Sequence, residues 1–168
     1  MSAPAEAAHP AAPQIRVGTG FDVHAYDAAS PLRLAGLDWP GEPGLSGHSD
    51  GDAVCHAIVD ALLSAAGLGD IGSLVGVDQP DTEGAASTGF VRLALARLAA
   101  QGWQAVNVSV QIVGNRPKFA PRREEAQRIM TELVGAPVSL GATTSDHLGF
   151  TGRGEGLAAI ATALIVRA

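Results

Sequence analysis

Hydrophobic and polar positions alternate along several stretches of the chain and repeat with a helical period in others. Alternation with period two is typical of strands, because successive side chains point to opposite faces of a sheet. The predicted strands are 15–26, 32–39, 105–114, 138–145 and 157–168. Apolar residues spaced three and four apart predict helices at about 50–66, 87–101 and 121–134. Residues 70–86 show no clear period and are expected to form a loop.

Residues that start and stop helices frame these segments. Ser49 or Asp50 can cap the first helix, Gly67 ends it, and Pro121 suits the first turn of the third. The PGEPG segment at 40–44 predicts a turn. Strands that alternate with helices, plus one short hairpin, indicate an α/β class of the α+β sandwich type. We therefore expect a mixed β-sheet with helices packed on one face, in a single domain.

Composition narrows the class of protein. The 168 residues suggest one domain, and 46% hydrophobic but only 4% aromatic residues predict an aliphatic core. A net charge of −6 argues against nucleic-acid binding, and no apolar run is long enough to predict a membrane helix. The single cysteine, Cys55, excludes an intrachain disulfide and fits the cytoplasm. The Ala- and Pro-rich residues 1–14 are expected to be a disordered tail, which leaves 15–168 as the domain.

A possible metal site comes from two separate segments. Asp22 and His24 are two positions apart on a predicted strand, so their side chains share one face. Asp52, His56 and Asp60 follow at intervals of four on the predicted helix, on a polar row. Three ligands with one open position are typical of catalytic zinc. The two helix carboxylates could accept the other N–H of His56, as partners of ligating histidines often do.

Other polar segments can be interpreted in two ways. Cys55 is displaced around the helix from the polar row, which favours a buried cysteine over a fourth ligand. His48 and Ser49 could cap the helix or seat a phosphate. The TGRGEG run at 151–156 could be a tight turn or a phosphate loop, and RPK at 116–118 could be a solvated tip.

Taken together, six motifs occur in one order. They are GFDVHA (20–25), HSDGD (48–52), HAIVDALL (56–63), GDIG (69–72), RPK (116–118) and ATTSDHLGFTGRGEG (142–156). In this combination the chain resembles the 2-C-methyl-D-erythritol 2,4-cyclodiphosphate synthase family of the non-mevalonate isoprenoid pathway. That family cyclises 4-diphosphocytidyl-2-C-methyl-D-erythritol 2-phosphate by attack of the 2-phosphate on the β-phosphate, with release of CMP. The resemblance implies a phosphorus–oxygen lyase.

The resemblance also implies roles for individual residues. Asp22, His24 and His56 would hold one divalent metal, most simply zinc. His48 and Thr144 match positions credited with transition-state stabilisation, and residues 114–120 match the cytidine pocket. Substrate contacts would come from Ser49, Asp70, Ile71, Gly72, Lys118, Thr143, Thr144, Ser145, Asp146, Phe150 and Arg153.

Further implications concern a second ion and assembly. Magnesium or manganese would accompany the substrate diphosphate, with Asp146 contributing through phosphates or water. The family forms homotrimers with sites between subunits, and Arg153 with Glu155 is expected near the trimer axis. Two departures from the family pattern stand out. VGVDQ (75–79) replaces a common Phe-Pro-Asp-Thr-Asp loop, and Asp146 stands where many members have Glu.

Two other functions fit the metal pattern without the resemblance. A zinc hydrolase could use Asp52 or Asp60 as a general base beside the metal. A noncatalytic module could bind a nucleotide or an isoprenoid without turnover.

Overall fold

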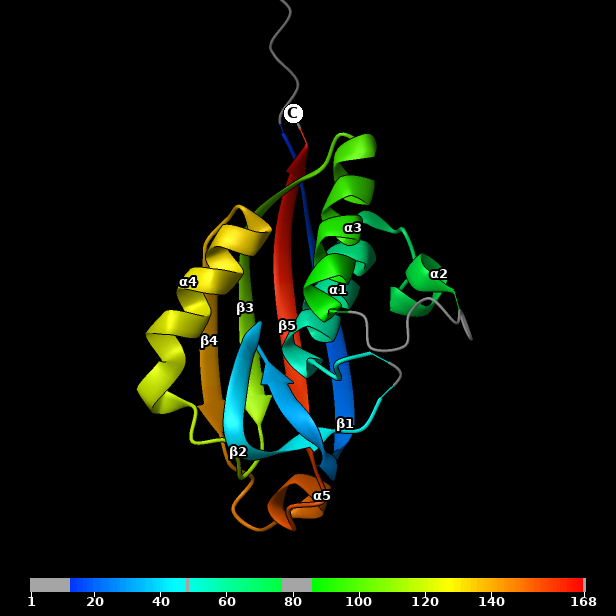
Figure 1. Cartoon of the computed structure of the whole chain (residues 1–168). Coiled ribbons are helices and arrows are strands. Elements are labelled where there is room, and N and C mark those ends of the chain that lie inside the picture. The colour runs from blue at the N-terminus through cyan, green and yellow to red at the C-terminus, as the bar shows by residue number, and fades with distance from the viewer. Residues whose placement is uncertain (1–12, 48, 77–85, 168) are drawn as a thin grey trace, which may run out of the picture.

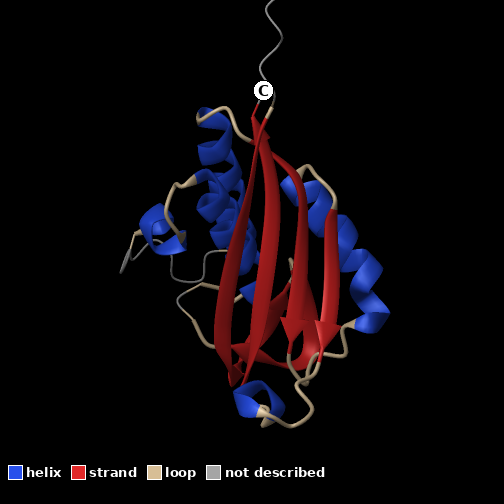
Figure 2. Cartoon of the chain, turned by 180° about the vertical axis from the view of Figure 1, so that it is seen from behind, coloured by secondary structure: helices blue, strands red, loops and turns tan. Residues whose placement is uncertain are grey.

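The computed structural model describes residues 13–47, 49–76 and 86–167. Its framework is a curled five-stranded sheet with strand order β2-β1-β5-β3-β4 (Figure 2). The strands are β1 (Gln14–Leu34), β2 (Leu37–Leu45), β3 (Gln104–Val113), β4 (Val138–Thr143) and β5 (Gly156–Arg167). Strands β3 and β4 run parallel, and the other neighbouring pairs run antiparallel. The predicted mixed sheet is confirmed.

Helices cover one face of this sheet. They are α1 (Ala53–Ala66), α2 (Ile71–Val75), α3 (Ser87–Ala100), α4 (Arg123–Val134) and α5 (Gly149–Gly152), with a 3₁₀ turn, η2 (Ala120–Arg122). Figures 1 and 2 show α1, α3 and α4 on the same side of the sheet, while α5 lies at one end. The predicted arrangement of helices on one face is therefore confirmed. No described helix is long and apolar enough to cross a membrane.

Strand β1 turns alternate residues toward α1, and two of these are glycines. A Cβ on Gly18 would lie 2.2 Å from the carbonyl oxygen of Ala61, and one on Gly20 would lie 2.1 Å from that of Ala57. Neither position has room for a side chain, so the glycines allow the helix backbone to approach the strand. The same face of β1 continues through positions 22 and 24.

The hairpin between β1 and β2 differs from the prediction. The turn lies at Ala35 and Gly36, which have φ values of 54° and 72°, and the expected turn at 40–44 is part of β2. The carboxylate of Asp52 accepts hydrogen bonds from the N–H groups of Ala35 (2.9 Å) and Gly36 (2.7 Å). A side chain distant in sequence thus stabilises the turn, which local composition could not indicate.

The start of α1 also differs from the prediction. The residue that caps it is Asp52, whose side chain accepts from the N–H groups of Val54 and Cys55. Ser49 and Asp50 lie before the helix and do not cap it. The predicted end is confirmed, because Gly67 adopts the left-handed conformation at the C-cap.

The segment expected to be a loop contains a short helix. Asp70 caps α2 and forms a reciprocal capping box with Ser73. Residues 77–85 lie outside the described residues, as do 1–12 of the predicted tail and most of the divergent VGVDQ stretch. Cys55 is fully buried, as predicted, and burial raises the pKa of its thiol.

Candidate metal and nucleotide site

Three side chains from β1 and α1 converge on one point. Asp22 Oδ2 lies 2.9 Å from His24 Nε2 and 3.3 Å from His56 Nδ1. The two ring nitrogens are 3.1 Å apart. The ligand atoms of all three residues lie within 4.8 Å of one another. The structure therefore brings together the triad that the sequence predicted.

The donor set fits a divalent cation. Asp22 Oδ2 is buried, and its contacts with the ring nitrogens of His24 and His56 lack hydrogen-bond geometry. A buried carboxylate oxygen that receives no well-directed hydrogen bond is costly, and a cation between it and the two imidazoles would offset that cost. One carboxylate and two imidazoles are a ligand set suited to zinc, with a fourth position left for water or substrate.

Protonation in this cluster follows from the neighbouring charges. Burial alone would raise the pKa of the Asp22 carboxyl, but the imidazoles of His24 and His56 hold it well below its usual range. Burial lowers the pKa of His24, whereas the carboxylate of Asp22 raises it, and the net direction is upward. Asp22 is therefore ionised at neutral pH, and a cation at His24 competes with a proton that this ring binds more strongly than a free imidazole does.

The remaining ring nitrogens contact groups that the sequence did not indicate. His24 Nδ1 bonds the carbonyl oxygen of Ser46. His56 Nε2 lies 2.8 Å from Ser87 Oγ and 3.1 Å from Ser49 Oγ. Ser87 follows 31 residues after His56 and begins a different helix, so no spacing rule could connect the two.

Asp52 and Asp60 were predicted to orient His56, but their hydrogen bonds go elsewhere. The Asp52 carboxylate accepts hydrogen bonds from backbone N–H groups of the hairpin turn and of the first turn of α1. Asp60 accepts the backbone N–H of Ile71 at 2.8 Å. It therefore ties α1 to the start of α2, where the predicted substrate residues Asp70, Ile71 and Gly72 lie together.

A cavity of about 530 Å³ opens at the ends of β3 and β4. We call it the β3–β4 cavity. Its lining comprises Gly114, Asn115, Pro117, Lys118, Phe119, Ala120, Pro121, Arg123, Ala142, Thr143 and Thr144. Most of the predicted cytidine segment and two of the predicted substrate contacts, Thr143 and Thr144, thus border one space.

The segment after β4 is a polar, largely exposed turn. Thr144 Oγ1 donates to Asp146 Oδ1 at 3.2 Å, and Ser145 Oγ lies 2.7 Å from Thr151 Oγ1. Asp146 has a positive φ of 48°, and its carboxylate is exposed. The side chains of Thr144 and Asp146 are therefore accessible to a ligand.

Two further predicted contacts lie beyond this turn, and one lies outside the described residues. Phe150 is partly exposed on α5, and Arg153 forms an exposed ion pair with Glu155 at 2.7 Å. His48 is not among the described residues.

Sheet register relates the metal group to the β3–β4 cavity. Asp22 pairs with Ala159, Ala159 with Ile112, and Ile112 with Ala142 at the cavity wall. The two features therefore lie at one level of the sheet, on its helix-covered face. Three strand spacings separate their backbones by roughly 14 Å.

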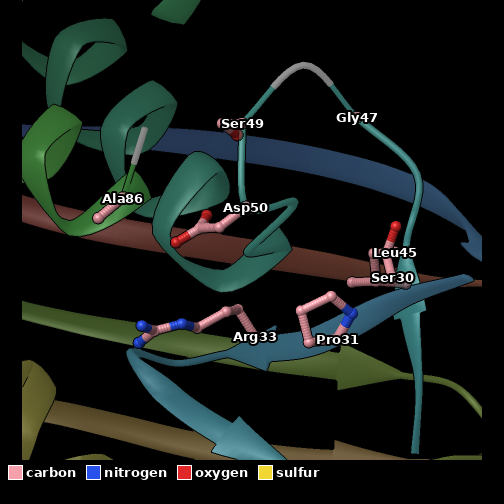
Figure 3. Close-up of a pocket in the computed structure, with 8 residues that line it drawn as sticks. All are labelled: Ser30, Pro31, Arg33, Leu45, Gly47, Ser49, Asp50 and Ala86. Atoms are coloured by element: carbon pink, nitrogen blue, oxygen red, sulfur yellow. The ribbon is translucent and has the colours of Figure 1, made fainter. Parts of the chain in front are cut away.

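A smaller cavity lies between the β1–β2 hairpin and the segment leading into α1. Its volume is about 300 Å³, and it is lined by Ser30, Pro31, Arg33, Leu45, Gly47, Ser49, Asp50 and Ala86 (Figure 3). Ser49 also contacts His56, so this cavity borders the metal group on the side of α3.

Comparison with known proteins identifies the family. The model of the YgbB family matches residues 15–166. The chain belongs to the YgbB family. A YgbB relative from Cutibacterium acnes, named 2-C-methyl-D-erythritol 2,4-cyclodiphosphate synthase, is 56% identical over 92% of each chain. The chain is thus a member of an enzyme family, as its sequence motifs predicted.

Other YgbB relatives differ in length or carry a ligand. A bifunctional enzyme IspD/IspF from Clavibacter michiganensis is 59% identical over 94% of this chain, which spans only 38% of that relative. A solved structure of 2C-methyl-D-erythritol-2,4-cyclodiphosphate synthase, described as a CDP-bound form, has a TM-score of 0.82. It is 37% identical and covers 89% of this chain and 99% of its own.

Proposed function

We propose that this protein converts 4-diphosphocytidyl-2-C-methyl-D-erythritol 2-phosphate to 2-C-methyl-D-erythritol 2,4-cyclodiphosphate and CMP. The observation that carries the proposal is the convergence of Asp22, His24 and His56 at the level of a cavity suited to a nucleotide. Both features lie on a fold shared with synthases of this name, one of them bound to CDP.

The reaction requires little proton transfer from the protein. The 2-phosphate is already an anion and attacks the β-phosphorus, while the bond to the α-phosphate oxygen breaks and CMP leaves. The barrier comes from anion repulsion and from folding the substrate into a ring. Binding both ends of the substrate on one rigid surface reduces the second cost.

The metal ligands would act on the phosphoryl group under attack. A zinc ion held by Asp22, His24 and His56 would supply Lewis-acid polarisation of a phosphoryl oxygen and neutralise charge. The triad itself carries one negative charge, so the loaded site is positive although the chain has a net charge of −6. This local charge accounts for how an acidic protein could bind a polyanion.

Residues around the β3–β4 cavity would hold the nucleotide end. Lys118 places a cation at its lining, and Thr143 and Thr144 offer hydroxyls at its rim. We propose that Thr144, with His48, donates hydrogen bonds to charge that builds on the phosphoryl oxygens. Asp146 is proposed to hold a second ion, magnesium or manganese, through phosphate oxygens or water.

The other end of the substrate would contact groups near α1 and α2. Ser49 is proposed to bind a phosphate, and the Asp70–Gly72 segment is proposed to bind the methylerythritol part. The bond from Ile71 N–H to Asp60 keeps that segment against α1. Phe150 and Arg153 are proposed as further ligand contacts.

Product analysis tests the proposed reaction directly. Zinc- and magnesium-loaded protein given the open-chain substrate should release CMP and cyclic diphosphate in equal amounts, and a chelator should stop both. An open-chain hydrolysis product would favour a zinc hydrolase. Tight CMP binding without turnover would favour a noncatalytic nucleotide-binding module.

We also propose that the active form is a homotrimer. One face of the sheet carries no described helix (Figure 2). Apolar side chains are exposed on this part of the fold, among them Val17 and Phe21 on β1 and Ile160 on β5. Apolar rows of this kind mark contact surfaces between proteins. A second and third copy packed there could bring the cavity of one chain toward the metal group of another.

A single charge should separate the subunits. Phe21→Asp is expected to convert a species of three chain masses into one of a single chain in analytical ultracentrifugation, because a carboxylate would be buried without a partner. Leu93→Asp is the control, since Leu93 on α3 is similarly exposed, at 53% against 57% for Phe21. A monomeric wild-type protein, or an unchanged Phe21→Asp trimer, would contradict the proposed interface.

A further inference from the structure

Ser87 is a fully buried polar residue that the metal ligands do not include. It is the first residue of α3, and its hydroxyl lies 2.8 Å from His56 Nε2. The same hydroxyl bonds a carboxylate oxygen of Asp50, and the Ser87 backbone N–H donates to the other oxygen at 3.1 Å. Asp50, Ser87 and His56 thus form a continuous chain of hydrogen bonds that ends at the metal group.

Counting donors and acceptors indicates where the hydrogen of each hydrogen bond in this series lies. An ionised carboxylate only accepts hydrogen bonds, and a serine hydroxyl carries a single hydrogen. Since the Ser87 hydroxyl gives its hydrogen to Asp50, its oxygen can only accept from His56. The 2.8 Å contact with Ser87 therefore favours the hydrogen of the neutral imidazole on Nε2. The competing contact of Nδ1 with the Asp22 carboxylate is longer, at 3.3 Å, and lacks hydrogen-bond geometry, so a lone pair on Nδ1 is left directed at Asp22 and His24.

We propose that Ser87 and Asp50 are positioning residues for the metal centre. They select the Nε2–H form of His56 and fix its ring plane, so that Nδ1 is ready to ligate a cation. The inference rests on the proposed metal role of the triad and assigns two residues to it that local sequence spacing did not reveal. Partners of this kind raise the metal affinity of a histidine and fix its orientation.

Asp50 is held in place for this role by the backbone around it. Its carboxylate also accepts the N–H of Asp52 at 3.3 Å, and it lies in the segment between β2 and α1, directed toward α3 (Figure 3). Three donors on one carboxylate leave it little freedom to rotate. This series of hydrogen bonds therefore joins the loop before α1, α1 itself and the start of α3.

Ser49 is also near His56 Nε2, but it is not anchored in the same way. Its hydroxyl lies 3.1 Å from that nitrogen and 3.3 Å from Ser87 Oγ, and it accepts the N–H of Gly51 at 3.3 Å. No carboxylate contact to the Ser49 hydroxyl is found in the described structure. Ser87, which has the shorter contact and the carboxylate behind it, is therefore the residue that determines the tautomer.

The tautomer can be read without metal or substrate. Nitrogen-15 NMR of the metal-free protein at mildly alkaline pH, where an unperturbed imidazole is neutral, distinguishes protonated from bare ring nitrogens. The His56 signals are assigned by their loss in His56→Gln. We expect the wild type to carry its hydrogen on Nε2 and folded Ser87→Ala to show a mixture of tautomers. A hydrogen on Nδ1 in the wild type, or an unchanged spectrum in Ser87→Ala, would overturn the proposal.

Metal affinity gives a second and independent measurement. Zinc titration against a competing chelator should show affinity about 10- to 100-fold lower for Ser87→Ala. Asp50→Asn should also bind zinc more weakly, because an amide cannot accept at both oxygen positions. Ser64→Ala is the control, since Ser64 is exposed on α1, the helix that carries His56. Circular dichroism melting identifies variants that have lost the fold.

The two failures are distinguishable. If the wild type binds no divalent cation at the triad, the proposed function fails, whereas the NMR result still judges the tautomer assignment. If the wild type binds zinc and both folded variants bind it equally well, the positioning role of Ser87 and Asp50 is refuted while the metal site stands.

Discussion

His56→Ala is expected to lose stoichiometric zinc binding and to lower kcat for cyclisation by about 10³-fold or more. The variant removes one of three converging ligands and leaves Asp22 and His24 alone on β1. Lewis-acid stabilisation of several kcal/mol would be lost, and each 1.36 kcal/mol corresponds to about a factor of ten in rate. Metal content by atomic emission and turnover by CMP release measure both effects.

His147→Ala serves as the control for metal content. His147 is exposed in the turn after β4 and belongs to no described metal group, so this variant should retain wild-type zinc. Thermal melting of both variants shows whether lost metal reflects lost fold. Full turnover in a folded, metal-free His56→Ala protein would contradict the catalytic role of the metal.

Much of the fold could be predicted because its elements follow local rules. The helices at 87–100 and 53–66 end near glycines and carry regular apolar positions, and strands β3 and β5 alternate clearly. The turn predicted at 40–44 was wrong, because the actual turn at Ala35 and Gly36 is stabilised by Asp52, which is 17 and 16 residues away along the chain. Boundaries set by such distant contacts have no local signal.

The same distinction applies to the site. Asp22 and His24 are predictable as a pair because strand geometry alone sets their common face. His56 was a reasonable third ligand, since helical spacing displays it on a polar row. Its real hydrogen-bond partner, Ser87, depends on how α3 packs against α1, and sequence reasoning instead favoured the neighbouring carboxylates. Residues that orient a ligand through tertiary packing are therefore the least predictable part of this site.

Gly20→Ala is expected to weaken both folding and metal binding, because Gly20 determines how closely α1 approaches β1. A new Cβ would lie 2.1 Å from the Ala57 carbonyl oxygen and 2.6 Å from the Ala61 backbone nitrogen. These are backbone atoms of a buried helix, so the helix must shift. Overpacking of this kind typically costs about 1–3 kcal/mol, and occasionally more. Urea unfolding measures the loss.

The expected loss of zinc affinity follows from the same displacement of α1. His56 is one residue before Ala57, so moving this turn of α1 away from β1 separates Nδ1 from the two ligands on the strand. We expect folded Gly20→Ala to bind zinc at least tenfold more weakly than the wild type. Chelator competition measures that affinity in buffer without denaturant.

A second glycine provides the matched control for this prediction. Gly89 lies inside α3, where a Cβ would meet nothing within 4 Å. Gly89→Ala should leave zinc affinity unchanged and stabilise the protein by up to about 1 kcal/mol, since alanine favours helices. If Gly20→Ala matched this control in both stability and zinc affinity, close packing of α1 on β1 would not be what assembles the triad. The presence of glycine at positions 18 and 20 would then need a different explanation.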